Sequence, residues 1–331
     1  MIDNKISVIM AVYNGEKYIK DTIDSILNQE YNNFELIIVD DCSQDRTVDI
    51  IQSFRDSRII LLRNDRNMKL AYSLNRAIEK SSGYYIARMD ADDICAPNRF
   101  TKQVKYMEQN PSVAVLGGYA KQFGDSEKLL RYPKNHEKIK IELLFGNPLS
   151  HPAVMFRKDK IGQWYDPKIK AGQDYELWSK LIWEVEFHNL SDILVYYRIH
   201  SAQTRNTLGK SQKEGVVYAL HNMMDRLGEY SDEDAFTLAL SGNKNEGKTI
   251  DELKKIKNLY ARILSDVETK PELMDSKLLW KRMQKQYAIL IYASLIYKTI
   301  SWKDVNKTGL LRAFLKRPEL VVKALIHSVI R

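Results

Sequence analysis

The sequence contains little cysteine and no long apolar run. Only Cys42 and Cys95 occur among the 331 residues, no Cys-x-x-Cys pair is present, and no apolar leader follows Met1. We therefore expect the chain to stay in a reducing, cytoplasmic compartment. The longest uncharged apolar run, Gln286 to Tyr297, is too short to cross a bilayer. The chain is thus expected to be soluble, or peripheral on the inner face of the cell membrane.

The glycine-rich motifs that hold nucleotide phosphates in many proteins are absent. No Gly-x-Gly-x-x-Gly sequence follows the first expected strand, and no Gly-x-x-x-x-Gly-Lys-Ser/Thr sequence occurs anywhere. These absences exclude the dinucleotide-binding fingerprint and the P-loop. A nucleotide, if the protein binds one, must be held in another way.

Charged residues are unevenly distributed along the chain. The net charge of +8 would suit a nucleic acid or an anionic membrane as partner. Residues 303–331 hold seven basic and two acidic side chains, a net charge of +5, so most of the excess lies in this tail. The rest of the chain is nearly neutral, which argues against a basic nucleic-acid groove. We therefore expect no nucleic-acid partner.

Short apolar runs alternate with amphipathic segments in the first 93 residues. The strands expected from apolar runs are residues 6–11, 34–39, 59–62 and the run that starts at Tyr84. The helices expected between them cover residues 18–27, 46–54 and 68–80. This alternation predicts an α/β fold with a mostly parallel sheet flanked by helices.

Acidic residues follow two of these strands. Asp40 and Asp41 end the second strand, and Asp90, Asp92 and Asp93 end the fourth. Right-handed crossovers bring the carboxyl ends of parallel strands to one edge of the sheet, so both groups should face the same crevice. Carboxylates that repel one another suit a hard cation such as Mg²⁺ or Mn²⁺, which also binds phosphate oxygens. The pattern predicts a metal–diphosphate site, with solvated acidic turns as the alternative.

Six motifs, taken in their order, resemble the family 2 glycosyltransferases with the GT-A fold. They lie within about residues 5–204 and are Ser7–Glu16, Val39–Thr47, Asp90–Asp93, Ser150–Lys158, Gly172–Trp178 and Tyr197–His200. Six motifs in order are far more specific than any one of them. The resemblance implies a Rossmann-like nucleotide half and an inverting transferase of the type that builds bacterial surface polysaccharides such as capsule or O-antigen.

The resemblance implies a role for four residues at the strand ends. Tyr13 would stack on the nucleotide base, and Asp41 would accept a hydrogen bond from the base ring N–H, which favours uridine. Asp90 would contact the ribose or the sugar, and Asp92 would bind the divalent cation that bridges the diphosphate. A packed turn aromatic is the alternative for Tyr13. Asp93 is expected to cap the next helix.

Other motif residues are assigned to the same ligand. The motifs place Ala11, Glu16 and Ala91 at the nucleotide-sugar. Arg198 suits a diphosphate, and His200 suits the metal ion or a phosphate oxygen. Exposed positions on a surface loop are the alternative for Arg198 and His200.

By the resemblance, Asp174 is the catalytic base. An inverting transferase needs one base to deprotonate the acceptor hydroxyl, opposite the leaving diphosphate. The family usually has Glu before this Asp, so Gln173 is expected to alter hydrogen bonding to the acceptor without removing the chemistry. His151 and Trp178 are also placed at the acceptor or in the shell behind it. A helix N-cap is the alternative for Asp174 and a hydrogen-bonded structural role the alternative for His151.

The chain departs from the family pattern in one loop near the donor. Members often carry Asn-x-Gly before a helix that contains Asn. Here Asn67-Met-Lys69 lacks the Gly, while Asn75 is kept. The loop is expected to differ in shape or to bring Lys69 to a phosphate, with a solvated Lys69 as the alternative.

From about Thr204 onward the pattern changes to helices. We therefore divide the chain into a GT-A catalytic domain, residues 1–204, and a helical C-terminal region, residues 205–331. Thr249-x-x-Glu252 is a capping box, and a long helix is expected from about Ser276. No catalytic constellation is expected in this region.

The tail combines an apolar helical face with basic residues. The apolar positions are Val321, Val322, Leu325, Ile326, Val329 and Ile330. Helices of this kind lie on anionic membrane surfaces. Packing of the tail on the catalytic domain is the alternative.

The sequence thus predicts transfer of a sugar from a UDP-sugar to a glycan acceptor. The resemblance implies that this acceptor is linked to a polyprenol diphosphate. Mn²⁺ or Mg²⁺ is the expected cofactor. The rival enzyme is a sugar-phosphate nucleotidyltransferase, which would need a Gly-rich, Arg-containing loop after the first strand, and Val12–Glu16 is not such a loop. A non-catalytic nucleotide-sugar-binding protein on the same fold is the third possibility.

Overall fold

The computed structural model describes residues 4–200, 209–243 and 245–307. The chain forms two compact units. The first comprises Met1–Ile139 and Asn147–Gly215, and the second comprises Lys140–Gly146 and Val216–Arg331. The predicted domain boundary at residue 204 and the predicted tail helix both lie outside the described residues.

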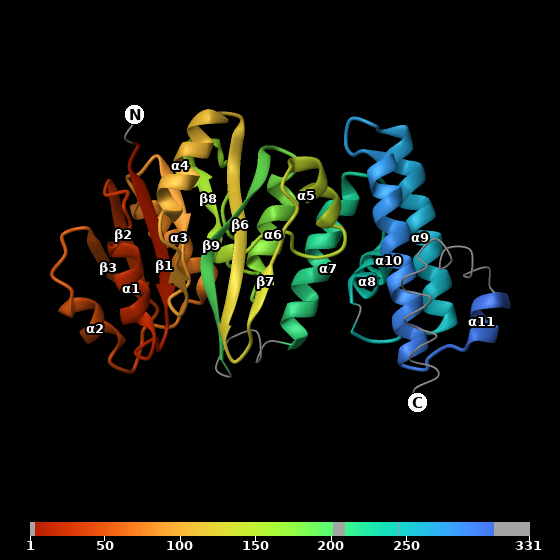
Figure 1. Cartoon of the computed structure of the whole chain (residues 1–331), viewed down its shortest axis with the longest axis horizontal. Helices are drawn as coiled ribbons and strands as arrows, with labels where there is room; N and C mark the ends of the chain where they lie inside the picture. Colours follow the sequence, from red (N-terminus) through yellow and green to blue (C-terminus); the bar gives the residue numbers. More distant parts are fainter. Residues whose placement is uncertain (1–3, 201–208, 244, 308–331) are drawn as a thin grey trace. The chain divides into compact units, whose positions relative to one another are not determined.

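The first unit is built on one mixed sheet (Figure 1). The strand order is β3-β2-β1-β4-β8-β6-β9-β5, and β7 pairs with β6. The strands are β1 (Ile6–Val12), β2 (Phe34–Asp40), β3 (Ile59–Arg63), β4 (Tyr85–Arg88), β5 (Ile94–Cys95), β6 (Val113–Gly124), β7 (Lys128–Leu130), β8 (Met155–Arg157) and β9 (Glu186–Ile199).

The helices follow the alternation that the sequence predicts as far as β4. They are α1 (Ile19–Leu27), α2 (Thr47–Ser53), α3 (Leu70–Lys80), α4 (Arg99–Gln109), α5 (His136–Glu142), α6 (Gln173–Leu181), α7 (Gly209–Asp225), α8 (Asp232–Gly242), α9 (Ile250–Thr269), α10 (Ser276–Ile296) and α11 (Trp302–Lys307). Short 3₁₀ turns cover His151–Ala153 and Lys158–Lys160.

The strands β1 to β4 run parallel to one another, and β6 and β9 form a second parallel pair. Every residue of β2 is buried, as expected for a strand that is covered on both faces. Apolar side chains of α1, α2 and α4 join the core on one face, whereas α3 packs against β1 and β2 outside that cluster and so covers the other face. The predicted sheet flanked by helices is confirmed over this stretch. Its carboxyl edge carries Tyr13, Asp41 and Asp90.

Antiparallel strands complete that edge. β8 runs against β4, with Ala87 opposite Met155, so the chain that precedes β8 extends beyond the carboxyl end of β4. β5 runs against β9, with Ile94 opposite Tyr196. The residues before β5 therefore face the residues after Tyr196. The pairings of β8 with β4 and of β5 with β9 thus bring the residues before β8 and the residues after Tyr196, which are distant in sequence, to the end of β4.

The second unit is helical. Its helices α8 and α9 begin with capping boxes at Ser231 and Thr249, the second of which the sequence predicts. The Tyr287 hydroxyl of α10 donates a hydrogen bond to the Leu253 carbonyl of α9 at 3.0 Å. Among the residues that the structure describes, no helix combines the length and the apolar character needed to span a membrane.

A buried carboxylate ties the amino-terminal ends of three strands together. Glu35 on β2 accepts hydrogen bonds from the Ser7 hydroxyl at 2.5 Å, the Ser82 N–H at 2.8 Å and the Lys5 ammonium at 2.7 Å. Ser7 and Glu35 are register partners on β1 and β2. Gly83 approaches Ser7 so closely that an added Cβ would lie 2.5 Å from the Ser7 nitrogen. Burial by itself would raise the pKa of Glu35, but these hydrogen bonds outweigh burial and lower the pKa to about 2.

We predict that Glu35→Gln lowers the free energy of unfolding by about 2–3 kcal/mol at neutral pH, because the amide cannot accept these charge-assisted hydrogen bonds. The contribution of the carboxylate is fully present above the ordinary pKa of 4.5 and is lost as the pH falls toward about 2. Urea unfolding of both proteins at several pH values measures this difference. The exposed Glu79→Gln variant is the control. A Glu35→Gln penalty that stays constant from neutral to strongly acid pH would contradict the assignment.

Candidate active site

The carboxyl end of β1 presents an exposed aromatic ring. Tyr13 is 51% exposed, and the adjacent Asn14 has a positive φ of 52°. The Asn14 N–H donates a hydrogen bond to the Ser43 hydroxyl at 2.9 Å, which ties the turn to the loop after β2. The ring of Tyr13 therefore lies outside the core, where a planar base has access to it.

Asp41 organises the loop that follows β3. Its Oδ1 accepts hydrogen bonds from the Asn64 amide and the Met68 N–H, both at 2.7 Å, and its Oδ2 accepts one from the Lys69 N–H at 2.8 Å. A carboxylate offers about four acceptor positions, so roughly one remains for a ligand N–H. The role of Asp41 toward a base stays a prediction.

Lys69 occupies the position where the resembling family has Gly. Its backbone has φ 72° and ψ 167°, a region that is essentially reserved for glycine, and its side chain is exposed. Such a conformation costs about 1–3 kcal/mol in a residue with a Cβ, and here the hydrogen bond to Asp41 holds it. The loop thus keeps the glycine-type backbone. Asn75 of α3 donates to the Tyr165 carbonyl at 2.7 Å and accepts from its N–H at 3.2 Å.

The other predicted donor residues of β1 and its loop lie at the same edge. Ala11 is half-buried near the end of β1, opposite Val39. Glu16 is exposed, and its Oε2 accepts a hydrogen bond from the Arg46 N–H at 3.1 Å. Their contacts with a nucleotide-sugar stay predictions.

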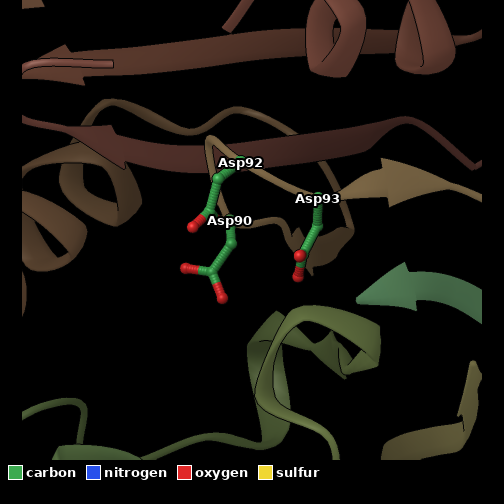
Figure 2. A group of neighbouring side chains, drawn as sticks. All are labelled: Asp90, Asp92 and Asp93. Carbon is green, nitrogen blue, oxygen red and sulfur yellow. The ribbon is translucent and has the colours of Figure 1, made fainter. Parts of the chain in front are cut away.

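Three carboxylates meet on the short turn between β4 and β5. Figure 2 shows Asp90 and Asp92 side by side and Asp93 further along the turn. One oxygen from each lies within 4.8 Å of the others. The Ala91 and Asp93 carbonyls accept hydrogen bonds from the Thr22 hydroxyl of α1 at 3.0 and 2.7 Å, which fixes the turn.

Each of the three acids is compensated differently. Asp90 forms an ion pair with Arg88, whose guanidinium is almost fully buried. Asp92 Oδ2 lies 3.0 Å from His200 Nε2. Asp93 is fully buried and accepts a hydrogen bond from the Arg198 N–H at 2.8 Å, while its Oδ2 has no hydrogen-bond partner among the described residues.

Mutual repulsion persists despite these contacts. Burial and then the charge of Asp90 raise the pKa of Asp92, against the opposing effect of His200. Burial and then the charges of Asp90 and Asp92 raise the pKa of Asp93 well above its usual value. Closely spaced carboxylates of this kind fit a hard divalent cation, and the orphaned Asp93 oxygen supports that fit. Asp92 and His200 are the residues predicted to hold it.

The prediction that Asp93 caps a helix is wrong. The residue is followed by β5, and α4 begins only at Arg99, with Asn98 as its N-cap. Asp93 instead fastens the turn to β9 through the Arg198 N–H. The cause is the antiparallel pairing of β5 with β9, which places Arg198 across from the turn.

Arg198 is built into this turn as well. Its Nε donates a hydrogen bond to the Asp92 carbonyl at 2.8 Å. Its guanidinium lies between two rings, 4.5 Å from the centroid of Tyr18 and 4.6 Å from that of Phe123. The His200 ring lies 4.8 Å from Tyr18. The two residues therefore belong to the acidic turn and not to an open surface loop, whereas contact of Arg198 with a diphosphate stays a prediction.

Asp174 is the second residue of α6. The N-cap of this helix is Gly172, with a left-handed φ of 77°, so Asp174 is not an N-cap. The Asn147 amide donates a hydrogen bond to Asp174 Oδ2 at 2.6 Å. Burial raises the pKa of Asp174, against backbone N–H groups at the helix start, the charge of Arg88 and the Asn147 amide. A half-buried carboxylate with a raised pKa is suited to accept a proton.

His151 lies in an aromatic cluster with Tyr165 and Trp178. Its Nε2 is 2.7 Å from the Tyr165 hydroxyl, and its ring packs edge-on against Trp178 at 6.0 Å. Burial and then the charge of Arg88 lower the pKa of His151 well below its usual value, which keeps the imidazole neutral. Trp178 is fully buried and stacks against Phe156, and its contact with an acceptor stays a prediction.

Gln173 faces back into its own loop. It is buried, and its amide donates a hydrogen bond to the Lys170 carbonyl at 3.0 Å. The structure therefore gives Gln173 a role in the turn that leads into α6. A contact with an acceptor stays a prediction.

Arg88 links the acidic turn to Asp174. It pairs with Asp90, and its charge also acts on Asp174 and Tyr165. Burial raises the pKa of Tyr165 against the charge of Arg88, and the charges of Asp174 and Asp90 raise it further. Two guanidinium nitrogens of Arg88, Nε and Nη1, are buried without a hydrogen-bond partner among the described residues.

Sequence reasoning missed Arg88, Asn147 and Tyr165. Arg88 could have been found, because it is a charged residue inside an apolar run. A buried charge rarely occurs without a partner, so such a residue indicates a nearby acid. Asn147 and Tyr165 stand in irregular segments, where no periodicity marks them.

We predict different stability effects for two neighbouring acids in metal-free buffer. Asp90→Asn should lower the free energy of unfolding by about 2 kcal/mol or more, because it leaves the buried Arg88 without its counter-charge. Asp92→Asn should change it by less than about 0.5 kcal/mol, because it also removes a repulsion. Urea unfolding monitored by circular dichroism measures both. Equal effects of the two substitutions would show that Arg88 does not depend on Asp90.

Comparison with known sequences identifies the family. The family model described as Glycosyl transferase family 2 matches residues 7–163. The O-antigen biosynthesis glycosyltransferase WbnJ of Escherichia coli is 39% identical over 231 residues, which cover 67% of this chain and 89% of WbnJ. An uncharacterized glycosyltransferase of Haemophilus influenzae is 32% identical over 242 residues, which cover 66% of this chain and 75% of that relative.

Solved structures share the fold at low sequence identity. S. aureus TarS 1-349 in complex with UDP-GlcNAc has a TM-score of 0.58 and 18% identity, with 89% of this chain and 91% of that chain covered. The mannosyltransferase PcManGT from Pyrobaculum calidifontis, in complex with GDP-Man and Mn²⁺, has a TM-score of 0.54 and 16% identity, with coverage of 88% and 87%. Because identified relatives match over most of their length, this chain belongs to glycosyltransferase family 2 and has the GT-A fold.

Proposed function

We propose that the protein is an inverting, metal-dependent glycosyltransferase that moves a sugar from a UDP-sugar to a hydroxyl group of a glycan acceptor. The observation that carries the proposal is the pair of carboxylate sites around Arg88. Asp90 forms an ion pair with Arg88, and the charge of Arg88 also acts on the half-buried Asp174. A single displacement with inversion needs a leaving-group site and a base at opposite ends of the reacting carbon.

The donor would lie along the carboxyl edge of the parallel strands. Tyr13 offers an exposed ring to the base, and Asp41 keeps an acceptor position for a ring N–H. The strands β2, β1 and β4 are neighbours in the sheet, so the ends that carry Asp41, Tyr13 and Asp90 follow one another along this edge. A UDP-GlcNAc complex of TarS and a GDP-Man complex of PcManGT support a nucleotide-sugar on this fold.

Asp92 and His200 would hold a divalent cation, with Asp90 and Asp93 completing the negative charge around it. A Mn²⁺ in the PcManGT complex supports this cofactor. When bound, such a cation neutralises charge on the departing diphosphate. The chain's own part is to keep the carboxylates close together through Arg88, Arg198 and Thr22.

Asp174 would act as the base. Its carboxylate takes the proton of the acceptor hydroxyl while the acceptor oxygen forms a bond to the anomeric carbon. The bond from that carbon to the diphosphate breaks at the same time, and its electron pair leaves with UDP. Attack from the side opposite the leaving group inverts the configuration. Burial raises the pKa of Asp174, which strengthens it as a proton acceptor.

The acceptor is proposed to be a lipid-linked glycan in surface polysaccharide biosynthesis. The O-antigen enzyme WbnJ supports the pathway class, because it matches this chain over 89% of its own length. Such acceptors sit on a polyprenol diphosphate at the membrane, which makes a peripheral location at the cytoplasmic face part of the proposal.

We predict that two substitutions separate metal binding from base catalysis. Asp92→Ala should abolish metal-dependent UDP release and weaken binding of UDP in the presence of Mn²⁺, because the ion loses a carboxylate. Asp174→Asn should keep UDP affinity but lower turnover about 10²–10⁴-fold, the usual contribution of a general base. UDP release from a panel of UDP-sugars, with and without Mn²⁺, and calorimetric titration with UDP provide the measurements.

Three outcomes would overturn parts of the proposal. If GDP-sugars are added to the panel, faster release of GDP than of UDP would show that the donor carries guanine and not uracil. Normal turnover by Asp174→Asn would assign the base to another residue. Nuclear magnetic resonance of the product gives the anomeric configuration, and retention would contradict the inverting mechanism.

The tail proposal rests on sequence, because residues 308–331 lie outside the described residues. Each basic residue near an anionic surface contributes about 1 kcal/mol, which salt screens. We predict that full-length protein co-sediments with anionic liposomes at low salt and is released at high salt. Truncation before Gly309 should keep donor hydrolysis and lower transfer to a lipid-linked acceptor. If the full-length protein does not bind anionic liposomes at low salt, or if the truncated protein does not fold, the tail packs on the catalytic domain and the membrane proposal is wrong.

A further inference from the structure

Asn147 donates a side-chain hydrogen bond to the carboxylate of the proposed base, in addition to the backbone N–H groups at the start of α6. Its Nδ2 lies 2.6 Å from Asp174 Oδ2. The orientation of the amide is fixed, because Asn147 Oδ1 accepts a hydrogen bond from the Leu149 N–H at 3.2 Å. Only the oxygen of the amide accepts such a bond, so the NH₂ group must face Asp174.

The turn that carries Asn147 is itself held firmly. Leu149 is buried, with 3% of its surface exposed. The Asn189 amide of β9 donates to the Pro148 carbonyl at 3.1 Å and to the Pro133 carbonyl at 2.7 Å. The Asn147 side chain therefore projects from a preorganised loop, and its position is set by the sheet and not by Asp174.

We infer that Asn147 is the positioning residue of the base: its amide occupies Asp174 Oδ2 and thereby directs Oδ1 toward the acceptor hydroxyl. The inference rests on the proposed function, because it needs Asp174 to act as the base. It goes beyond that proposal by naming the oxygen that takes the proton and the residue that selects it.

Chemistry explains why an amide suits this position. A carboxylate that rotates freely spends part of its time with neither oxygen aimed at the acceptor, and a misplacement of about 1 Å costs up to a hundredfold in rate. An N–H donor fixes one oxygen and leaves the other as a proton acceptor. A second carboxylate at 2.6 Å would do the opposite, because the two acids would share a proton.

The charged and titratable groups around Asp174 come from several segments. Arg88 at the end of β4 opposes the rise in the pKa of Asp174. Tyr132, which follows β7, and Tyr165, which precedes α6, both have a raised pKa, for which burial is the main cause and the charge of Asp174 contributes. None of these groups is altered in the variants below.

The test compares three single variants. Asn147→Asp keeps the acceptor for the Leu149 N–H but replaces the donor with a carboxylate. Asn147→Ala removes both. Asn135→Ala is the matched control, since this exposed Asn also accepts a turn hydrogen bond, from the Lys138 N–H at 3.1 Å, without contacting Asp174.

UDP release is measured as a function of pH with Mn²⁺ and the UDP-sugar that the wild type turns over fastest. Asn147→Asp should lower kcat about tenfold to a hundredfold and shift the acid limb of the kcat profile to higher pH by about one unit. Asn147→Ala should also lower kcat, but by a smaller factor than Asn147→Asp. KM for the donor, UDP affinity and the thermal midpoint should match those of Asn135→Ala.

The outcomes separate this inference from the proposed function. Wild-type kcat and an unshifted acid limb in Asn147→Asp, alongside an inactive Asp174→Asn, would overturn the positioning role and leave the base assignment intact. Normal turnover by Asp174→Asn would overturn the proposed base, and this inference with it. A lowered kcat accompanied by a lowered thermal midpoint, with no shift of the acid limb, would assign Asn147 a structural role only.

Discussion

Repulsion among the carboxylates after β4 is the constraint on which the site depends. Three acids within four residues cannot pack at the end of a strand unless positive charge or N–H groups reach them. Arg88 comes from β4 itself, while the Arg198 N–H and His200 come from the end of β9. The acidic turn is therefore stable only where two strands that are distant in sequence end together.

Strand direction supplies that meeting point. β5 pairs with β9 through only two residues, yet this pairing sets Asp92 and Asp93 across from Arg198. Antiparallel pairing of β8 with β4 likewise carries the segment before β8 past the end of β4. A parallel β8 would leave the segment that precedes it at the opposite edge, whereas β9 runs in the same direction as β4 and ends at the carboxyl edge in any case. The antiparallel direction of β8 thus brings its preceding segment next to the acidic turn.

The parallel half of the fold could be predicted because its apolar runs and helical spacing are local signals. The acids after β2 and β4 and the base candidate Asp174 could be predicted for the same reason, with the family resemblance adding their roles. The two-residue strand β5 could not be predicted, since a pairing of that length has no periodicity. The sequence therefore does not reveal that Asp93 bonds to β9 instead of capping a helix. Asn147 lies in an irregular segment that no periodicity marks. The sequence shows that Lys69 replaces a Gly, but its glycine-type backbone is visible only in the dihedral angles.

The two sides of the site differ in how they are built. The donor side rests on paired strands, where the ladder hydrogen bonds and a core of fully buried side chains fix the positions of Tyr13, Asp41 and Asp90.

The segments around the proposed base are held by side-chain amides instead. Asn75 of α3 bonds to the Tyr165 backbone, and Asn189 of β9 bonds to the Pro148 carbonyl beside Asn147. Loop segments of this kind tolerate substitution better than paired strands do. The position of the proposed base thus depends on a few side-chain amides outside the apolar core, of which Asn75 is half-buried and Asn147 is exposed.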